Sequence, residues 1–289
     1  MKLATFTHAN ATRLGVVMDD GIVDLTAAAP DLPREMKALL AAGKPALAAA
    51  RAATTKASKR LPTADVHLEA PVSHPPEFLA VGLNYADHVE EAKLAKPTFP
   101  LFFNKQSVCV TGPYDPIHLP RVSEKLDYEG ELGFVIGRKC RHVPRERAHE
   151  VIAGYLVVHD VSVRDWQFKA QTMTLGKSFD THGPIGPWIV TPDEIGDPHA
   201  LELRTWVNGE QRQHSNTREL IFDCFELVAT LSTVFTLEPG LIVSTGTPGG
   251  VGGPQKKYLK VGDVVKIEVE RIGHLENHVI PEPADTACI

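Results

Sequence analysis

The chain has 289 residues, of which 43% are hydrophobic and 23% are charged, and its formal net charge is −6. This composition is typical of a globular protein with a sizeable core, and the negative charge argues against nucleic-acid binding, which favours a basic surface. No run of about 18 apolar residues is present, so we expect no membrane span. The first residues also lack the apolar stretch of a secretory signal, so we expect a cytoplasmic protein.

Residues 1–70 are expected to form a small α+β domain. Two short β-rich runs flank a tight turn at Asp20-Gly21. Residues 32–57 are rich in alanine and lysine and have the spacing of one or two amphipathic helices, with an interruption near Gly43. The segment contains no cluster of acids or histidines, so we assign no chemistry to it.

Residues 71–289 are expected to form a larger, strand-rich domain. Short β-rich runs alternate with turn signals along its length, and helical periodicity is confined to ERAHEVIAG (146–154) and LIFDCFELVATLSTV (220–234). This pattern predicts an α+β fold dominated by antiparallel strands.

A group of acidic residues in this domain indicates a metal site. Glu129 and Glu131 lie two residues apart in LDYEGELGFVIG, so they point to the same face of a strand. Asp160 ends the apolar run GYLVVHD, where an unpaired charge is costly. Adjacent carboxylates repel one another unless a cation lies between them, and oxygen ligands suit Mg²⁺ or Mn²⁺, with Ca²⁺ as a further candidate. Acids that alternate on a strand are also typical of a solvated face, so the assignment depends on the neighbouring motifs.

A lysine could balance the charge that remains. Three carboxylates and one dication leave one negative charge, and Lys177 in LGKSFDTHGP is the candidate to neutralise it. The alternative for Lys177 is an ordinary surface position.

The ordered motifs of residues 76–280 together resemble the fumarylacetoacetate hydrolase family, including its acylpyruvate and fumarylpyruvate hydrolases. The motifs are VGLNYADHVEEA, FFNKQSV, DYEGELGFVIG, HDVSVRDWQ, LGKSFDTHGPIGPW, TWVNGE and STGTPGGVG. The resemblance implies this family's fold, a mostly antiparallel mixed β-sandwich roll with few helices, preceded by a small N-terminal domain. It also implies a homodimer.

The resemblance gives roles to several side chains. It implies that the two glutamates and the aspartate bind the cation and that Lys177 lies beside it as a catalytic residue. Arg164 and Gln167, in VRDWQ, are implied to face the substrate. Thr247, in STGTPGG, matches a residue that binds a substrate carboxylate or carbonyl with help from the backbone of the glycine-rich turn.

His88 and Glu91 match a His–Glu pair on a short lid helix of hydrolytic and decarboxylating relatives. Residues three apart share a helix face, so Glu91 could orient and polarise His88, and a neutral imidazole can take a proton from water. If the match to the family is shifted by one position, Glu90 is the partner of His88 instead of Glu91. The non-catalytic alternative is that His88 is an exposed histidine on a mobile helix.

Two further residues, Tyr85 and Lys105, are implied to bind substrate. Relatives often have Lys-Pro where this chain has Lys105-Gln106, and the change affects the loop that shapes the pocket. His182 is an additional candidate for the pocket, with a structural role in a turn as the alternative.

The implied reaction is the metal-dependent hydrolysis of a C–C bond in a β-diketone or 2,4-dioxo acid of the acylpyruvate type. The alternative is a lyase or isomerase that uses the same enolate chemistry, such as an oxaloacetate decarboxylase, a ureidoglycolate lyase or a 2-hydroxyhepta-2,4-diene-1,7-dioate isomerase. A third hypothesis, a non-catalytic binding protein, would be favoured by the loss of an acid or of Lys177, and all of these residues are present.

Overall fold

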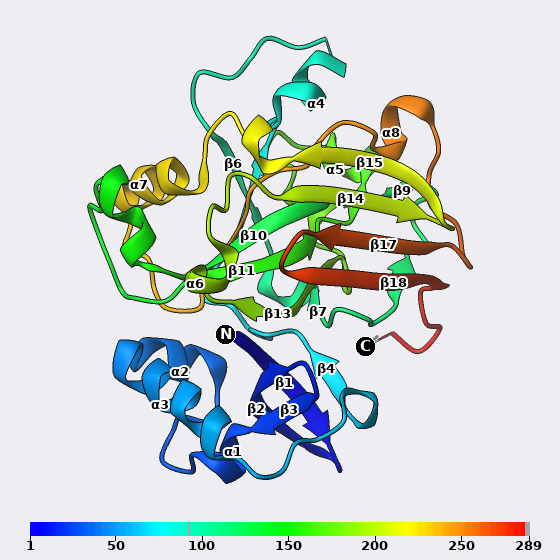
Figure 1. The fold of residues 1–289 in the computed structure, drawn as a ribbon. Coiled ribbons are helices and arrows are strands. Elements are labelled where there is room, and N and C mark those ends of the chain that lie inside the picture. Colours follow the sequence, from blue (N-terminus) through cyan, green and yellow to red (C-terminus); the bar gives the residue numbers. More distant parts are fainter. Residues whose placement is uncertain (92, 287–289) are drawn as a thin grey trace.

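A computed structural model describes residues 1–91 and 93–286. The first part of the chain forms a β-meander covered by helices, as the sequence predicted, and lies below the rest of the molecule in Figure 1. Its elements are β1 (Lys2–His8), β2 (Ala11–Met18), β3 (Gly21–Asp24), α1 (Leu25–Ala28), α2 (Met36–Ala41), α3 (Gly43–Lys56) and β4 (His67–Glu69).

The N-terminal strands continue the largest sheet of the molecule. This sheet has the order β3-β2-β1-β13-β11-β10-β16-β5-β6, and β4 pairs with β1. β1 meets β13 in antiparallel register, with Lys2 opposite Val190. The division of the chain at residue 70 therefore stays a prediction, because backbone hydrogen bonds join the two parts.

The rest of the chain builds the body of the molecule, which is mixed α+β and rich in strands. Its strands are β5 (Phe78–Gly82), β6 (Leu101–Lys105), β7 (Val110–Thr111), β8 (Ile117–Leu119), β9 (Leu126–Asp127), β10 (Gly130–Ile136), β11 (Ile152–His159), β12 (Ser162–Val163), β13 (Gly183–Val190), β14 (Glu202–Val207), β15 (Glu210–Asn216), β16 (Ile242–Ser244), β17 (Val264–Val269) and β18 (Gly273–Pro281). Its α-helices are α4 (Ala86–Glu91), α5 (Arg164–Gln167), α6 (Pro192–Ile195), α7 (Cys224–Val234) and α8 (Gly252–Gln255).

A second sheet, of order β15-β14-β17-β18-β8, packs across the main sheet (Figure 1). Alternate residues of β10 make this contact, because they point to the same face of the main sheet. Leu132, Phe134 and Ile136 lie in the same apolar cluster as Leu203 and Ile267 of the second sheet. Most strand pairs are antiparallel, as predicted, and β5 with β16 is one of the parallel exceptions.

One helix prediction was wrong. ERAHEVIAG forms a short 3₁₀ helix, Arg145–Glu150, and the chain then enters β11 at Ile152. The residues from Ile152 onward are completely buried in the centre of the main sheet, so strand packing prevails over a local helical period. The second predicted helix is present as α7 and begins after its cap residue Asp223, whose side chain accepts the N–H groups of Phe225 and Glu226.

No helix of the described part of the chain is long and apolar enough to cross a membrane.

Candidate metal centre

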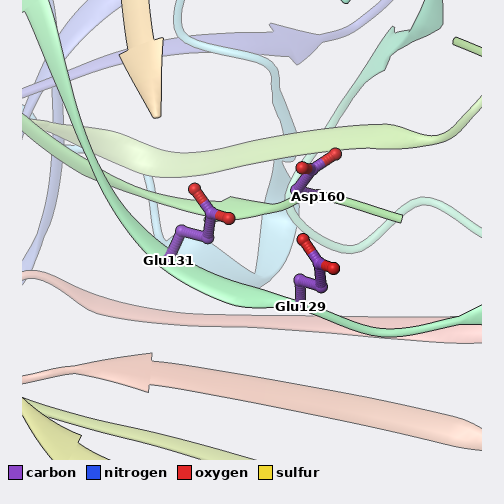
Figure 2. Close-up of side chains that lie close together, drawn as sticks. All are labelled: Glu129, Glu131 and Asp160. Atoms are coloured by element: carbon purple, nitrogen blue, oxygen red, sulfur yellow. The ribbon is translucent and has the colours of Figure 1, made fainter. Parts of the chain in front are cut away.

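The three predicted metal ligands come together at one end of the β10–β11 pair. Gly130 lies opposite His159 in this antiparallel pair, and the N–H of Asp160 donates to the carbonyl of Glu129 at 2.9 Å. This register places Glu129, which directly precedes β10, and Glu131 beside Asp160. One carboxylate oxygen of each lies within 4.8 Å of the others, and all three residues are buried. Figure 2 shows the three side chains converging on one space.

Strand alternation explains why the acids share a face. On β10, Glu131 and Val135 are separated by an even number of residues and lie on the face opposite to Leu132. On β11 the same face carries Val158, which pairs with Glu131. Val135 and Val158 belong to the apolar cluster that contacts the N-terminal helices. The acids therefore occupy the end of a face that is otherwise apolar, where a bare negative charge is costly.

Two buried lysines neutralise part of this charge. The ammonium group of Lys177 bridges Glu129 Oε2 at 2.7 Å and Asp160 Oδ2 at 2.8 Å. Lys105 donates to Asp160 Oδ1 at 2.7 Å and to the carbonyls of Lys177 and His182. All three donors of Lys105 are thus used within the protein, so this residue holds Asp160 and the 177–182 segment together.

Arg164 supplies a third cation. Its Nη1 donates to Glu129 Oε1 at 2.6 Å and to Gln167 Oε1 at 2.9 Å, and its Nε donates to Asp127 Oδ2 at 2.7 Å. Its Nη2 is buried without a hydrogen-bond partner among the described residues. Burial alone raises the pKa of Glu129, but the charges of Lys177 and Arg164 prevail and lower it to about 2.

Glu131 is in a different environment. Ser244 donates to its Oε2, and the N–H of Gly246 donates to the same oxygen at 2.8 Å. Burial, followed by repulsion from Asp160 and Glu129, raises the pKa of Glu131 well above its ordinary value. A divalent cation beside these three groups would remove that repulsion.

The residues present fit a hard divalent cation. All three candidate ligands are carboxylates, and each keeps at least one lone pair beyond the hydrogen bonds described, because Glu131 accepts both of its bonds at Oε2. Asp127 brings the carboxylates to four, and they face three cationic side chains, so the formal charge of the group is −1. A dication changes it to +1, which favours an anionic ligand.

Thr247 lies against the ligand strand, held by Gln213 of β15. The hydroxyl of Thr247 donates to Gly130 O at 2.9 Å and accepts from Gln213 Nε2 at 2.8 Å. Gln213 Oε1 in turn accepts the N–H of Gly130 at 3.0 Å. The one proton of the Thr247 hydroxyl is already donated to Gly130 O, so in this arrangement the hydroxyl can only accept a hydrogen bond from a ligand. A substrate carboxylate would have to accept from backbone N–H groups instead, or replace Gly130 O as the acceptor of that proton.

His88 and Glu91 lie on α4, as predicted, but they are not hydrogen-bonded. His88 Nδ1 lies 3.8 Å from Glu91 Oε2 and is buried with no hydrogen-bond partner in the described chain. Glu91 Oε2 instead accepts the N–H of Gly250 at 2.9 Å, which ties α4 to the glycine-rich turn. α4 lies near the top of Figure 1, and no hydrogen bond or ion pair joins this pair to the three acids among the described residues.

The remaining candidates are buried around this centre. Tyr85 is fully buried, and its hydroxyl has no partner among residues 1–91 and 93–286. Gln167 is buried beside Arg164, and its amide reaches Met173 Sδ at 3.5 Å. His182 Nε2 donates to the carbonyl of His118 at 2.8 Å, and burial lowers the pKa of His182 to about 3, so its ring stays neutral. The predicted roles of Tyr85 and Gln167 in binding substrate, and the candidate place of His182 in the pocket, stay predictions.

Four supporting residues were missed by the sequence analysis. Asp127 holds Arg164, Gln213 holds Thr247, and Ser244 holds Glu131. Asn84 bonds the carbonyls of Phe222 and Thr245 and so supports the turn that follows β16. Asp127 could have been found, because it is an acid directly before the two glutamates in a buried run, whereas the others come from segments far away in the sequence.

The fold and the buried carboxylates define a protein with a candidate site for a divalent metal, and comparisons with known proteins identify its family. The family model for the C-terminal part of fumarylacetoacetate hydrolase matches residues 77–280. The mitochondrial oxaloacetate tautomerase of Xenopus laevis is 41% identical over 288 residues, which covers 97% of this chain and 90% of that protein. The corresponding protein of Rattus norvegicus is 43% identical over 263 residues, which covers 90% of this chain and 84% of the relative.

Solved structures show the same fold. The maleylpyruvate hydrolase of Sphingobium sp. SYK-6, in complex with Mn²⁺ and pyruvate, is 35% identical with a TM-score of 0.84, and 98% of this chain matches 100% of that one. A 5-carboxymethyl-2-hydroxymuconate delta-isomerase of Mycobacterium smegmatis is 37% identical with a TM-score of 0.78, at the same coverage. The chain belongs to the fumarylacetoacetate hydrolase family, whose members include hydrolases, isomerases and tautomerases. The expectation of a site for Mg²⁺ or Mn²⁺ is confirmed at this level.

Proposed function

We propose that this protein hydrolyses a C–C bond of a 2,4-dioxo acid of the acylpyruvate type. The observation that carries the proposal is the buried group of Glu129, Glu131 and Asp160. Lys105, Lys177 and Arg164 form ion pairs with this group. With Asp127 included, the formal charge of this group is +1 when a dication is bound, which matches an anionic oxo acid, and burial strengthens the charge interactions within the group.

The chain's own residues would provide binding and charge stabilisation. A bound divalent cation would polarise the 2-oxo group of the substrate and carry part of the negative charge that develops there. Lys177 lies against two of the ligands and would stabilise the oxygen on which an enolate forms. Arg164, whose Nη2 has a free donor in the described structure, would bind the substrate carboxylate.

Hydrolysis also needs a base for the attacking water. His88 is the candidate, because its Nδ1 has no protein partner in the described chain and Glu91 lies near enough to orient it after a small shift from 3.8 Å. The attack of water on the distal carbonyl would break the C–C bond, the proton from water would pass to His88, and the electron pair of the broken bond would move into the enolate. Protonation of the enolate carbon would then give pyruvate and a second carboxylic acid.

The relatives support two outcomes at this centre. The Sphingobium hydrolase, with Mn²⁺ and pyruvate, supports the hydrolytic proposal. The tautomerases of Xenopus laevis and Rattus norvegicus, at 41% and 43% identity, favour oxaloacetate tautomerisation as a second candidate. Tautomerisation moves a proton between carbon and oxygen with no attack of water, so it does not require a hydrogen-bonded His88–Glu91 pair.

A substrate panel separates these reactions. Protein stripped with EDTA and then given Mg²⁺ or Mn²⁺ would be offered acetylpyruvate, maleylpyruvate and oxaloacetate, and products would be followed by NMR. Metal-dependent formation of pyruvate with a second acid supports hydrolysis, and faster keto–enol exchange of oxaloacetate without loss of carbon supports the tautomerase. Release of CO₂ from oxaloacetate would identify the decarboxylase alternative instead.

Variants test the proposed base. His88→Ala should lower the hydrolytic kcat by about 100-fold or more, as expected for the loss of a general base, and should leave metal affinity unchanged. The matched control is His278→Ala, on the exposed side of β18. Equal hydrolytic rates of the two variants would refute the role of His88.

A further inference from the structure

A polar cavity lies outside the metal centre. It has a volume of about 720 Å³, is open to solvent, and is lined by the β14–β15 turn and the segment that follows α8. The side chains that define its chemistry are Arg212, Lys256, Lys257, Lys260, Tyr128 and Tyr258. This concentration of basic groups is unusual for a chain whose net charge is −6.

The basic side chains of this cavity are largely unneutralised. In the part of the chain that the structure describes, Lys256, Lys257 and Lys260 have no carboxylate within ion-pair distance. Arg212 pairs with Glu210 through Nη2 at 3.0 Å, but its Nε is buried without a hydrogen-bond partner. A buried donor without a partner costs free energy unless a ligand or water satisfies it.

The acids of the cavity do not cancel this charge. Asp263 lines the cavity, but its two oxygens accept from Asn208 Nδ2 and from the N–H of Lys260, each at 2.8 Å. Glu124 is the other acid of the lining. Four basic side chains therefore face these two acids and Glu210, the partner of Arg212, so the cavity keeps a net positive charge and attracts anions.

One short backbone segment contributes residues to both the cavity and the metal centre. Tyr128 lines the cavity and donates its hydroxyl proton to Gly250 O at 3.0 Å, whereas the next residue, Glu129, belongs to the metal centre. The N–H of Lys257 donates to Gly252 O at 2.9 Å, and Asp127 accepts the N–H of Gly252 at 2.8 Å. The same Asp127 holds Arg164.

We propose that this cavity binds a small, multiply charged anion, either a phosphate ester or a polycarboxylate. The lysines would supply mobile point charges, Arg212 a directed donor, and the two tyrosines an aromatic wall. A ligand held there would fix the segment from Gly250 to Lys260, and Asp127 would transmit this order to Arg164. The site is therefore a candidate effector site, independent of which reaction the metal centre performs.

Calorimetric titration of the metal-free protein tests the proposal, because neither metal nor turnover is involved. The two probes are pyrophosphate and tricarballylate, which separate the phosphate from the polycarboxylate source. We expect saturable binding of at least one probe, weakened tenfold or more in Lys257→Ala/Lys260→Ala. The matched control, Lys44→Ala/Lys56→Ala on α3, removes the same charge far from the cavity and should bind as the unmodified protein does.

A further variant separates this cavity from the cationic metal centre. Lys177→Met should keep the affinity for the probe if the anion binds in the cavity. Absence of binding of both probes, equal weakening by the two double variants, or loss of binding in Lys177→Met alone would each overturn the proposal.

Discussion

Asp127 is the residue whose replacement should reveal most about how the metal centre is supported. Its carboxylate is fully buried and accepts four hydrogen bonds: from the N–H groups of Tyr128, Gly252 and Gly253 at 2.7–2.9 Å, and from Arg164 Nε at 2.7 Å. An asparagine in its place keeps one acceptor oxygen and turns an N–H₂ group toward two of these donors. Two bonds are then lost and two buried donors are left without partners.

The expected cost follows from those two bonds. Each lost bond with a stranded buried donor costs about 1–3 kcal/mol, so Asp127→Asn should lower the free energy of unfolding by about 4 kcal/mol. Urea denaturation of the metal-free protein measures this difference. The matched control is Asp165→Asn, because Asp165 is partly exposed and accepts one bond, from Ser123 Oγ at 2.6 Å. If the free energy of unfolding of Asp127→Asn lies within about 1 kcal/mol of that of the control, Asp127 does not hold its four donors as described.

Three further predictions concern the same region. Mn²⁺ at 100 times its dissociation constant should raise the free energy of unfolding by about 2.7 kcal/mol, and thermal denaturation should show that Asp160→Asn abolishes this gain. Gly130→Ala would place a Cβ 2.3 Å from Thr205 Oγ1 and should cost about 1–3 kcal/mol in urea denaturation, so an unchanged midpoint would contradict the packing. In the unfolded chain His182 gains a proton as the pH is lowered through 6.5, whereas the folded residue stays neutral down to about pH 3. The free energy of unfolding should therefore decrease as the pH is lowered across this range. In His182→Gln, denaturation curves between pH 6.5 and 5 should show a smaller decrease.

The metal ligands could be predicted because they obey a local rule. Glu129 and Glu131 are two residues apart, and Asp160 ends a continuous apolar run, so strand alternation and the cost of buried charge made them candidates, and the neighbouring motifs supported the assignment. The fold class followed from the many short β-rich runs in the same way. The reaction was not predictable at this level, because the same centre occurs in relatives that hydrolyse, isomerise and tautomerise.

The supporting contacts were out of reach for a physical reason. Gln213 and Gly130 are 83 residues apart, and Ser244 and Glu131 are 113 apart, so neither pair leaves a periodic signal in the sequence. The helix expected at residues 146–154 failed for a related reason, since tertiary burial in the central sheet decides the conformation of Ile152 and the residues after it. The homodimer, the cytoplasmic location and the boundary at residue 70 stay predictions.

The pairing of β10 with β11 has a consequence for how the protein folds. All three predicted metal ligands lie in or directly beside these two neighbouring strands, and the register of a single hydrogen-bonded ladder brings them together. A metal-competent cluster can therefore arise before the second sheet or the N-terminal helices have docked. We expect metal binding to stabilise this strand pair locally. Amide hydrogen exchange in β10 and β11 should therefore slow more on metal addition than exchange in any other strand.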